Sequence, residues 1–511
     1  MAATCSRPRP WPTSARDFEG PPMTRMARTM GHTVVYMLGL VLNRGVAFLL
    51  VPFYTRALEP AVFARLDLCT ATVLILLPIF ELGMGTAMVR FYHLYDDADE
   101  QRGVTRTSFT FVLGAVAAWI TLAFALAGPL SRVVFGVADQ TTFIRLVAVT
   151  TGITVLGNQV LSLLRAQEKS VQFAVLNLTR SLVGPGAIVL LVVRFDMGLL
   201  GVLWGDIAGL ATMTLVGLVM CRRWFGFGVD GGVLRRMLRF GVPLLSMGLA
   251  TSIITLSDRY FLRAWVGLEG LAVYSLGFKV AMIITLVTRA FQTAWPASAY
   301  QIAKEPDGPQ HMADIARFVL GVVLSIALLL TLASPELVRL FGGRELYAAG
   351  RYVVPWIAFS YAVYLAVLYV FTAVTIANRT GLVFIVVCGG CLAKIGLNML
   401  LIKPFGALGA AASTLCAFVI ELALGYVVAQ RVYPVPYALG RIVPFAGIAA
   451  AAAVGAHWAG GLGSGTGVAV RAAIGLAFVG GALVTGLVTP AELRSACRQA
   501  GRLRERLFRR K

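Results

Sequence analysis

Long apolar segments are the feature of this sequence that most limits how the chain can fold. A helix needs about 20 apolar residues to cross a bilayer. Because lipid offers no partner to an unpaired backbone N–H or C=O group, such segments fold as helices. The expected spans are residues 32–55, 62–89, 107–129, 142–164, 171–193, 198–221, 241–265, 269–299, 312–334, 352–376, 381–402, 407–429, 442–461 and 467–488. The sequence therefore predicts an all-α polytopic membrane protein with about 14 transmembrane helices.

Composition and the placement of charge narrow the class of protein further. Of the 511 residues, 58% are hydrophobic and 14% are charged, which excludes an ordinary soluble enzyme. The formal charge of +21 could indicate nucleic acid, but basic residues cluster in tails and loops such as 222–240 and 502–511. Cytoplasmic loops of membrane proteins are enriched in Lys and Arg. We therefore expect a multi-pass protein of the inner (cytoplasmic) membrane, in contact with lipids and not nucleic acid, with both termini cytoplasmic.

An internal repeat divides most of the chain. Gly198 and Gly201 recur as Gly406 and Gly409 at an offset of 208 residues, which also superimposes the span boundaries. Spans 1–6 and 7–12 are predicted to be two parallel six-helix repeats, an arrangement found in transporters, and two C-terminal helices follow them. The expected parts are a disordered cytoplasmic tail (1–30), an N-lobe (31–221), a cytoplasmic linker (222–240), a C-lobe (241–430), an extension with the last two spans (431–488) and a basic cytoplasmic tail (489–511).

Charged side chains lie deep inside several predicted spans. A charge near the centre of a membrane helix costs about 2.5–3.5 kcal/mol, so it must face the bundle interior or a water-filled cavity. Arg presents a bidentate fork to phosphate and Lys a point charge, so a group of buried cations indicates a cavity for an anionic head group such as a diphosphate. The candidate substrate-binding residues are Arg44, Arg180, Arg259, Lys279, Arg289 and Lys394.

The charges inside the spans also have other interpretations. Asp258 could pair with Arg259 or Lys279 and only hold helices together. Carboxylates could instead carry a proton or a sodium ion that couples transport to a gradient. The ion-coupling candidates are Glu81, Asp206, Asp258 and Glu421.

Motifs for other chemistry are missing from the sequence. It contains no GxxxxGK[ST] loop for nucleotide phosphates, and its four histidines do not have metal-ligand spacing. Cys388 and Cys391 form a CxxC pattern inside an apolar segment with two glycines, where small residues for close helix packing are the better interpretation. We expect no cofactor, no metal and no catalytic residue.

Four stretches carry a family resemblance. They are NRGVAFLLVPFYTRAL (43–58), FELGMGTAMVRFY (80–92), FGVPLLSMGLATSIITLSDRYFL (240–262) and YSLGFKVAMIITLVTRAFQTAWPA (274–297). With these stretches the region 32–430 resembles the polysaccharide-transport (Wzx-type) flippases of the multidrug/oligosaccharidyl-lipid/polysaccharide (MOP) exporter superfamily.

The resemblance implies two MATE-like lobes with alternating access around a cationic cavity, lined here by Arg44, Arg259 and Lys279. It implies transfer of an undecaprenyl diphosphate-linked oligosaccharide between membrane leaflets for polysaccharide biosynthesis, such as lipopolysaccharide O-antigen or exopolysaccharide. A polysaccharide polymerase and chain-length machinery would be partners. The first span has Asn43–Arg44 in place of the Arg–Asp pair of the peptidoglycan-precursor branch, which argues against lipid II as substrate.

Two other functions compete with the flippase interpretation. A multidrug or cation antiporter of the same fold should have a cavity dominated by acids, whereas cations prevail in these spans. A membrane polysaccharide polymerase or ligase needs a sizeable outer loop for its catalytic residues, and the longest expected outer loop is 335–351. The flippase interpretation therefore ranks first and the enzyme last.

Overall fold

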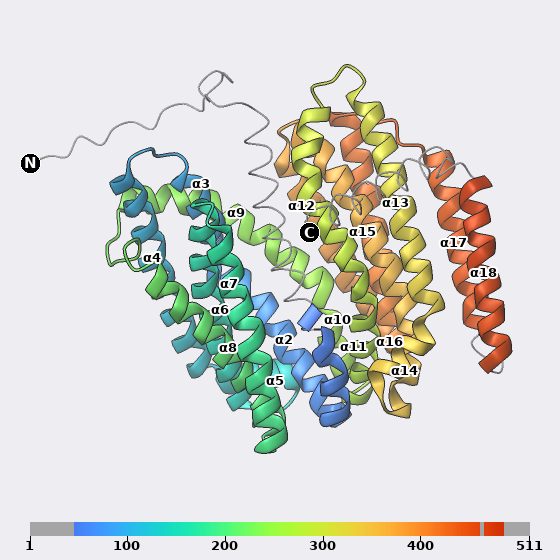
Figure 1. Cartoon of the computed structure of the whole chain (residues 1–511), viewed down its shortest axis with the longest axis horizontal. Coiled ribbons are helices and arrows are strands. Elements are labelled where there is room, and N and C mark those ends of the chain that lie inside the picture. The colour runs from blue at the N-terminus through green and yellow to red at the C-terminus, as the bar shows by residue number, and fades with distance from the viewer. Residues whose placement is uncertain (1–44, 47, 460–463, 485–511) are drawn as a thin grey trace, which may run out of the picture. The chain divides into compact units, whose positions relative to one another are not determined.

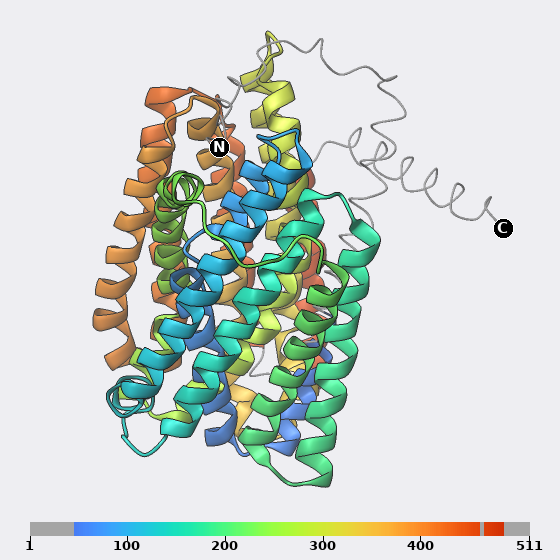
Figure 2. The ribbon, with the colours of Figure 1, turned by 90° about the vertical axis from the view of Figure 1, so that its left-hand side faces the viewer.

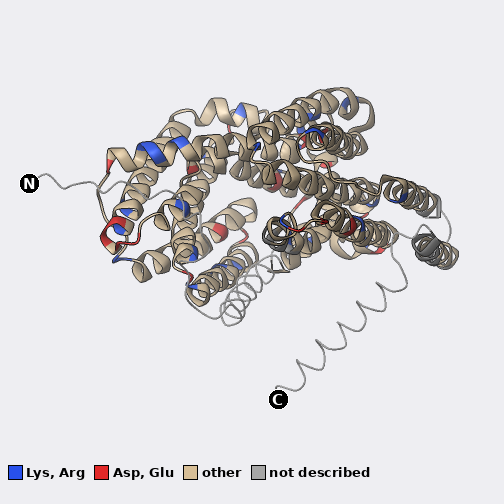
Figure 3. Ribbon diagram, turned by 90° about the horizontal axis from the view of Figure 1, so that it is seen from above, with Lys and Arg blue, Asp and Glu red and all other residues tan. Residues whose placement is uncertain are grey.

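The computed structural model describes residues 45–46, 48–459 and 464–484, and all regular secondary structure in these residues is helical (Figure 1). Ten helices in this part of the chain are long and apolar enough to cross a membrane. Charged positions are sparse along the ribbon (Figure 3). The prediction of a helical, multi-pass membrane protein is confirmed, while the count of fourteen spans and the repeat stay predictions. Most of the span 32–55 and both predicted tails lie outside the described residues.

The chain forms two compact units, and the first extends to Glu269. Its helices lie side by side as a bundle (Figure 2). In it, α2 packs against α6 and α9, α4 against α6, and α8 against both α6 and α7. The helices are α2 (Pro60–Glu81), α3 (Met84–Tyr92), α4 (Ala98–Ala125), α5 (Ala127–Phe135), α6 (Thr141–Ala166), α7 (Ser170–Val189, continued by the π-helical turn Leu190–Arg194), α8 (Gly198–Met220), α9 (Gly231–Leu256) and α10 (Asp258–Trp265).

A helix break interrupts the predicted span 62–89. Leu82 and Gly83 both adopt left-handed backbone conformations, with φ of 51° and 67°, so α2 ends and α3 starts in a new direction. A Cβ on Gly83 would lie 2.4 Å from the carbonyl oxygen of Gly241 in α9. Only glycine meets both the positive φ and this close approach without strain. The continuous span expected from hydropathy is thus wrong in this place.

The second unit begins at Gly270. In it, α15 packs against α13 and α16, and α17 pairs with α18 beside α13. The predicted outer loop 335–351 is itself mostly helical, formed by α14 and a 3₁₀ segment. The helices are α11 (Leu268–Ala281), α12 (Thr285–Ile302, after the 3₁₀ turn Met282–Ile284), α13 (Gly308–Leu332), α14 (Ser334–Gly342), the 3₁₀ segment Glu345–Tyr352, α15 (Val353–Ile376), α16 (Thr380–Val432), α17 (Leu439–Ala459) and α18 (Ser464–Val484).

The longest helix, α16, contains a sharp kink that divides it into two limbs. Gly406 has φ 56° and ψ −129°, outside the helical region, and Pro404 lies just before it. Proline cannot donate the helical hydrogen bond, and glycine tolerates the reversal. The limbs correspond to the predicted spans 381–402 and 407–429.

The division between the units does not fall in the predicted linker 222–240. Asp230 caps α9 by accepting a hydrogen bond from the Val233 N–H at 2.9 Å, so the second half of that linker is already helix. From there α9 packs on α2, α3 and α4 of the first unit. The predicted lobe boundaries stay a prediction about which helices move together.

Candidate functional site

A buried cluster of three charges lies where α10 begins. The Arg259 guanidinium donates to Asp258 Oδ1 at 2.7 Å and to Asp67 Oδ2 of α2 at 3.2 Å. A third hydrogen bond runs from Arg259 Nη1 to the Thr255 carbonyl at 2.9 Å. The side chains of Arg259, Asp67 and Asp258 are at most 5% exposed. The cluster therefore keeps its charges out of solvent and joins α2 to α10.

A neighbouring hydrogen bond ties the same two helices. The hydroxyls of Thr72 in α2 and Tyr260 in α10 are 2.8 Å apart. The sequence left open a pairing of Asp258 with Arg259, which the structure contains, but did not indicate Asp67 as a partner. An acidic residue inside the apolar run of span 62–89 was the available signal.

A second ion pair in the first unit is much more accessible. Arg180 of α7 and Asp206 of α8 lie 3.9 Å apart, with side chains 34% and 45% exposed. The Tyr54 hydroxyl lies within electrostatic range of Asp206. At that separation and exposure the pair is weak, so the Arg180 guanidinium can exchange its partner for another anion.

Glu81 occupies the last position of α2, beside the helix break. A Cβ on Gly85 would lie 2.5 Å from Glu81 Oε1, so the carboxylate packs directly on the start of α3. Arg165 of α6 lies within electrostatic range and donates to Ser162 Oγ at 2.8 Å. Glu81 is thus positioned to stabilise the break between α2 and α3.

In the second unit, Lys394 of the first limb of α16 is surrounded by oxygen atoms of the second limb. Its Nζ lies 2.6 Å from Thr414 Oγ1, 2.9 Å from Ser413 Oγ and 3.5 Å from the Ala410 carbonyl. Asn398 Oδ1 accepts from Ser413 Oγ at 2.5 Å. Lys394 is fully buried, so its ammonium group holds the two limbs together across the kink.

Glu421 is the buried carboxylate of the second limb. It is 2% exposed, and its Oε2 has no hydrogen-bond partner among the described residues. A Cβ on Gly390 would lie 3.2 Å from Glu421 Cβ, so this glycine inside the CxxC pattern does serve close packing. The Tyr364 hydroxyl of α15 lies within electrostatic range of both Glu421 and Arg289. Burial of an ionised carboxylate without full hydrogen bonding is costly, so this position favours the neutral, protonated carboxyl group.

Two other cations of the second unit reach accessible positions. Lys279 is half-buried in α11, where the other residues from Leu271 to Ala281 are buried. Arg289 is exposed on α12. Arg259 and Lys279 belong to different units, so their meeting on one diphosphate stays a prediction.

The candidate residues thus fall into two classes. Arg259 and Lys394 are enclosed by the protein, whereas Arg180, Lys279 and Arg289 are accessible at least in part. Arg44 lies outside the described residues. This difference in accessibility, and not the presence of charge alone, decides which cations can meet a ligand.

Comparisons with known proteins agree with this picture of a membrane transporter fold. Residues 31–300 match a family model described as polysaccharide biosynthesis protein. No curated protein matches the sequence. The structure of lipid II flippase MurJ in an inward closed conformation is similar, with a TM-score of 0.68, 12% identity, and coverage of 87% of this chain and 98% of that one.

Two transporters of the MOP superfamily also have similar structures. An inward-facing multidrug resistance MATE family transporter has a TM-score of 0.62 and 13% identity, covering 78% of this chain and 97% of its own. A transporter from Pyrococcus furiosus, described by the reverse polarity of its binding pocket, has a TM-score of 0.60 and 14% identity, covering 81% and 96%. At sequence identities of 12–14%, these similarities show that the folds are alike and nothing more.

Proposed function

Because the chain belongs to the polysaccharide biosynthesis protein family, we propose that it is a flippase for an oligosaccharide linked to a lipid (undecaprenyl) diphosphate. It would carry this substrate between the leaflets of the cytoplasmic membrane by alternating access. The observation that supports the proposal is the set of accessible cations within membrane helices: Arg180, Lys279 and Arg289. These side chains are exposed at least in part, and a diphosphate binds Arg and Lys through charge-assisted hydrogen bonds.

The two classes of cation have different roles in this proposal. Arg180, Lys279 and Arg289 contact the diphosphate-linked head group, since a ligand can reach them. Arg259 and Lys394 already donate to carboxylates and hydroxyls inside the protein, so they position helices instead. A head group that approached them would first have to break buried charge-assisted hydrogen bonds, which is costly.

Glu421 is our candidate for coupling transport to an ion gradient. Its buried position, and the lack of a hydrogen-bond partner for its Oε2 in the part of the chain that the structure describes, favour a carboxyl group that binds and releases a proton during the cycle. Asp258 is a weaker candidate because Arg259 holds it at 2.7 Å. Glu81 and Asp206 remain secondary candidates.

A multidrug antiporter is the main alternative function, because MATE family transporters share the fold. The acidic side chains at Asp67 and Asp258 do not support it strongly, since both already pair with Arg259. Accessible cations would repel a cationic drug. The head-group proposal therefore explains the accessible charges better.

Complementation of a strain that lacks the gene tests the proposal. The strain should accumulate the lipid-linked oligosaccharide and lose the exported glycan, and the wild-type chain should restore export. Arg180→Gln, Lys279→Gln and Arg289→Gln should each reduce export at unchanged membrane abundance. Arg145→Gln is the matched control, because Arg145 is exposed on α6 and takes no part in the proposed site. Full export from the Lys279→Gln, Arg289→Gln double variant would contradict the proposal.

A further inference from the structure

The first unit contains a pocket that the head-group proposal does not use. It has a volume of about 410 Å³ and lies between the end of α3, the turn that joins α6 to α7, and the residues after α8. Pockets for small molecules measure about 300–1,000 Å³. This side of the unit carries the segment 222–230, which is predicted to be cytoplasmic. The pocket is a widely open hollow with room for one small ligand unit, on the side where the substrate would arrive.

The turn between α6 and α7 has a defined conformation. Glu168 adopts a φ of +56°, and the Lys169 N–H donates to the Leu164 carbonyl at 2.9 Å. This left-handed C-terminal cap ends α6 and exposes Glu168 and Lys169 side by side at the pocket. Trp224, which follows α8, also lines the pocket, and its backbone N–H donates to the Cys221 carbonyl at 2.9 Å. Backbone hydrogen bonds thus fix the conformation of two segments that line the pocket, the turn between α6 and α7 and the residues after α8.

Gln167 gives the pocket an unusual polar group. Its Nε2 and Oε1 atoms are both buried, and neither meets hydrogen-bond geometry with a partner among the described residues. The Tyr92 hydroxyl lies within interaction distance of this side chain and is a candidate partner for it. More than about 90% of buried polar groups in proteins are hydrogen-bonded, so an unpaired amide needs an explanation. A ligand that both donates and accepts hydrogen bonds would complete the hydrogen bonding of the Gln167 amide.

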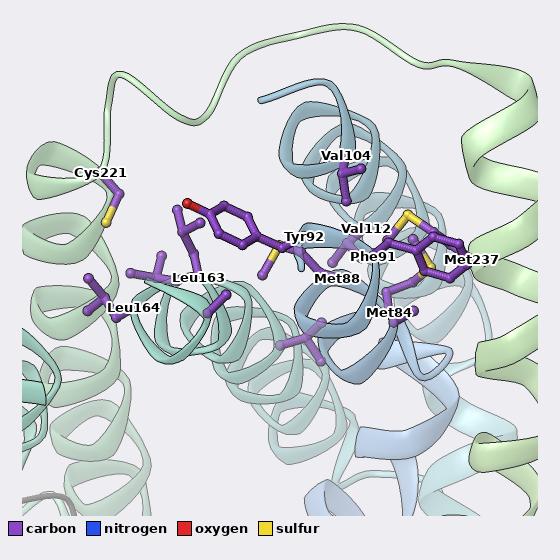
Figure 4. Packing of buried hydrophobic residues seen from close by; sticks show 14 of the residues in the cluster. Met84, Met88, Phe91, Tyr92, Val104, Val112, Leu163, Leu164, Cys221 and Met237 are labelled. Carbon is purple, nitrogen blue, oxygen red and sulfur yellow. The ribbon is translucent and has the colours of Figure 1, made fainter. Parts of the chain in front are cut away.

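Aromatic surface accompanies this amide. The rings of Tyr92 and Trp224 lie 5.7 Å apart at 48°, and the Tyr92–His93 ring pair is 5.6 Å apart. Figure 4 shows the Tyr92 hydroxyl on the side of the cluster where Cys221 lies, away from Met237. Trp224 is half-buried and lines the pocket, and the Arg102 guanidinium carbon lies 5.8 Å from its ring centroid. Aromatic rings can pack against the C–H groups of a ligand, and the neighbouring hydroxyl and amide groups can form hydrogen bonds with its hydroxyls.

The charges at the pocket argue against a bare phosphate as the ligand. Lys169 and Glu168 both line it, so their formal charges cancel. A phosphate would be attracted by the first and repelled by the second. A neutral ligand rich in hydroxyls can instead accept from the ammonium group and donate to the carboxylate.

We propose that this pocket binds one sugar residue of the glycan, distal to the diphosphate, before translocation. This inference rests on the proposed flippase function and adds a saccharide subsite to it. The Gln167 amide would pair with a sugar hydroxyl, the Tyr92 hydroxyl would donate to another, and the Trp224 ring would pack on the sugar's C–H face. The subsite would let the protein distinguish a lipid that carries its glycan from one that does not.

Binding of the free oligosaccharide tests the subsite directly. The probe is the repeat-unit oligosaccharide released from its lipid, added to the purified full-length protein in detergent. Wild type should bind it, and Gln167→Leu and Tyr92→Phe should each weaken binding by about tenfold through loss of one hydrogen bond. Trp204→Phe is the control, because Trp204 is exposed on α8 outside the pocket. Tyr92→Phe removes a single oxygen atom. If Gln167→Leu does not fold, oligosaccharide binding by Tyr92→Phe alone tests the subsite.

Flipping assays separate this inference from the function on which it rests. In proteoliposomes, the variants should flip the lipid with its complete repeat unit about tenfold more slowly, and the lipid with a single sugar at the wild-type rate. Binding and flipping by both variants at wild-type levels would overturn the saccharide subsite and leave the flippase proposal intact. A wild-type protein that flips neither lipid would overturn the flippase proposal. The binding measurement would then still show whether the pocket binds the oligosaccharide.

Discussion

Removal of the Arg259 side chain is the perturbation whose effect the structure defines best. Arg259 donates to Asp258 at 2.7 Å and to Asp67 at 3.2 Å, and all three side chains are at most 5% exposed. Arg259→Ala would leave two carboxylates buried close together without this cation. Breaking a buried ion pair by removing one partner costs about 3–5 kcal/mol. Because 1.4 kcal/mol is a factor of ten, the ratio of folded to unfolded protein should fall roughly a hundredfold to several thousandfold.

Size-exclusion elution and thermal unfolding of the detergent-purified protein measure this effect. Arg259→Ala should lower the folded yield and the melting temperature strongly, and Arg259→Lys should recover part of both because the charge remains but the planar fork is lost. Asp67→Asn should cost less, because Arg259 keeps Asp258. Arg145→Ala removes an exposed cation and serves as the control. Wild-type yield and melting temperature in Arg259→Ala, with loss of transport alone, would refute the reasoning and return Arg259 to the substrate site.

Three further perturbations follow from α16. Lys394→Met should lower the melting temperature, since the buried oxygens of Ser413 and Thr414 lose their donor at about 1–3 kcal/mol; an unchanged melting temperature with lost transport would argue for a substrate contact instead. Gly406→Ala should destabilise the protein by about 1–3 kcal/mol because φ 56°, ψ −129° is strained for alanine, whereas Gly381→Ala, with no atom within 4 Å of its Cβ, should be tolerated. Glu421→Gln keeps the side-chain size and should permit flipping that no longer responds to the proton gradient; a full response to an ionophore in this variant would exclude Glu421 as the coupling group.

Hydropathy predicted most helices of the fold because the burial of apolar residues in lipid is a local property. The predicted span 352–376 differs by one residue from α15, Val353–Ile376, and 142–164 lies within α6, Thr141–Ala166. It failed at Leu82 and Gly83, where the break depends on backbone dihedral angles and on the approach of Gly241 from a distant helix. Hydropathy does not report either quantity.

The sequence predicts which charged residues lie inside the spans, but it does not predict which of them are buried and paired. Arg259 and Lys394 stand out in the sequence as charges inside apolar segments, but their enclosure by the protein is visible only in the structure. The Asp67 partner of Arg259 is 192 residues away in the chain, so only the tertiary fold brings the two together. The oxygens around Lys394 come partly from hydroxyl residues, which no charge pattern marks. Whether a cation is accessible depends on how the helices pack. Only the three-dimensional structure therefore separates the cations that could bind a ligand from those that hold helices together.

Transbilayer movement of the lipid-linked oligosaccharide in proteoliposomes tests the central claim most directly. The purified chain is reconstituted with undecaprenyl diphosphate carrying the complete repeat unit, and a membrane-impermeant glycosidase reports the fraction of glycan on the outer leaflet over time. The account predicts that wild type exposes the inner-leaflet pool to the enzyme, and that the Lys279→Gln, Arg289→Gln double variant, present at equal abundance, does so far more slowly. An inner-leaflet pool that stays protected with wild type, or equal rates for wild type and the double variant, would contradict it.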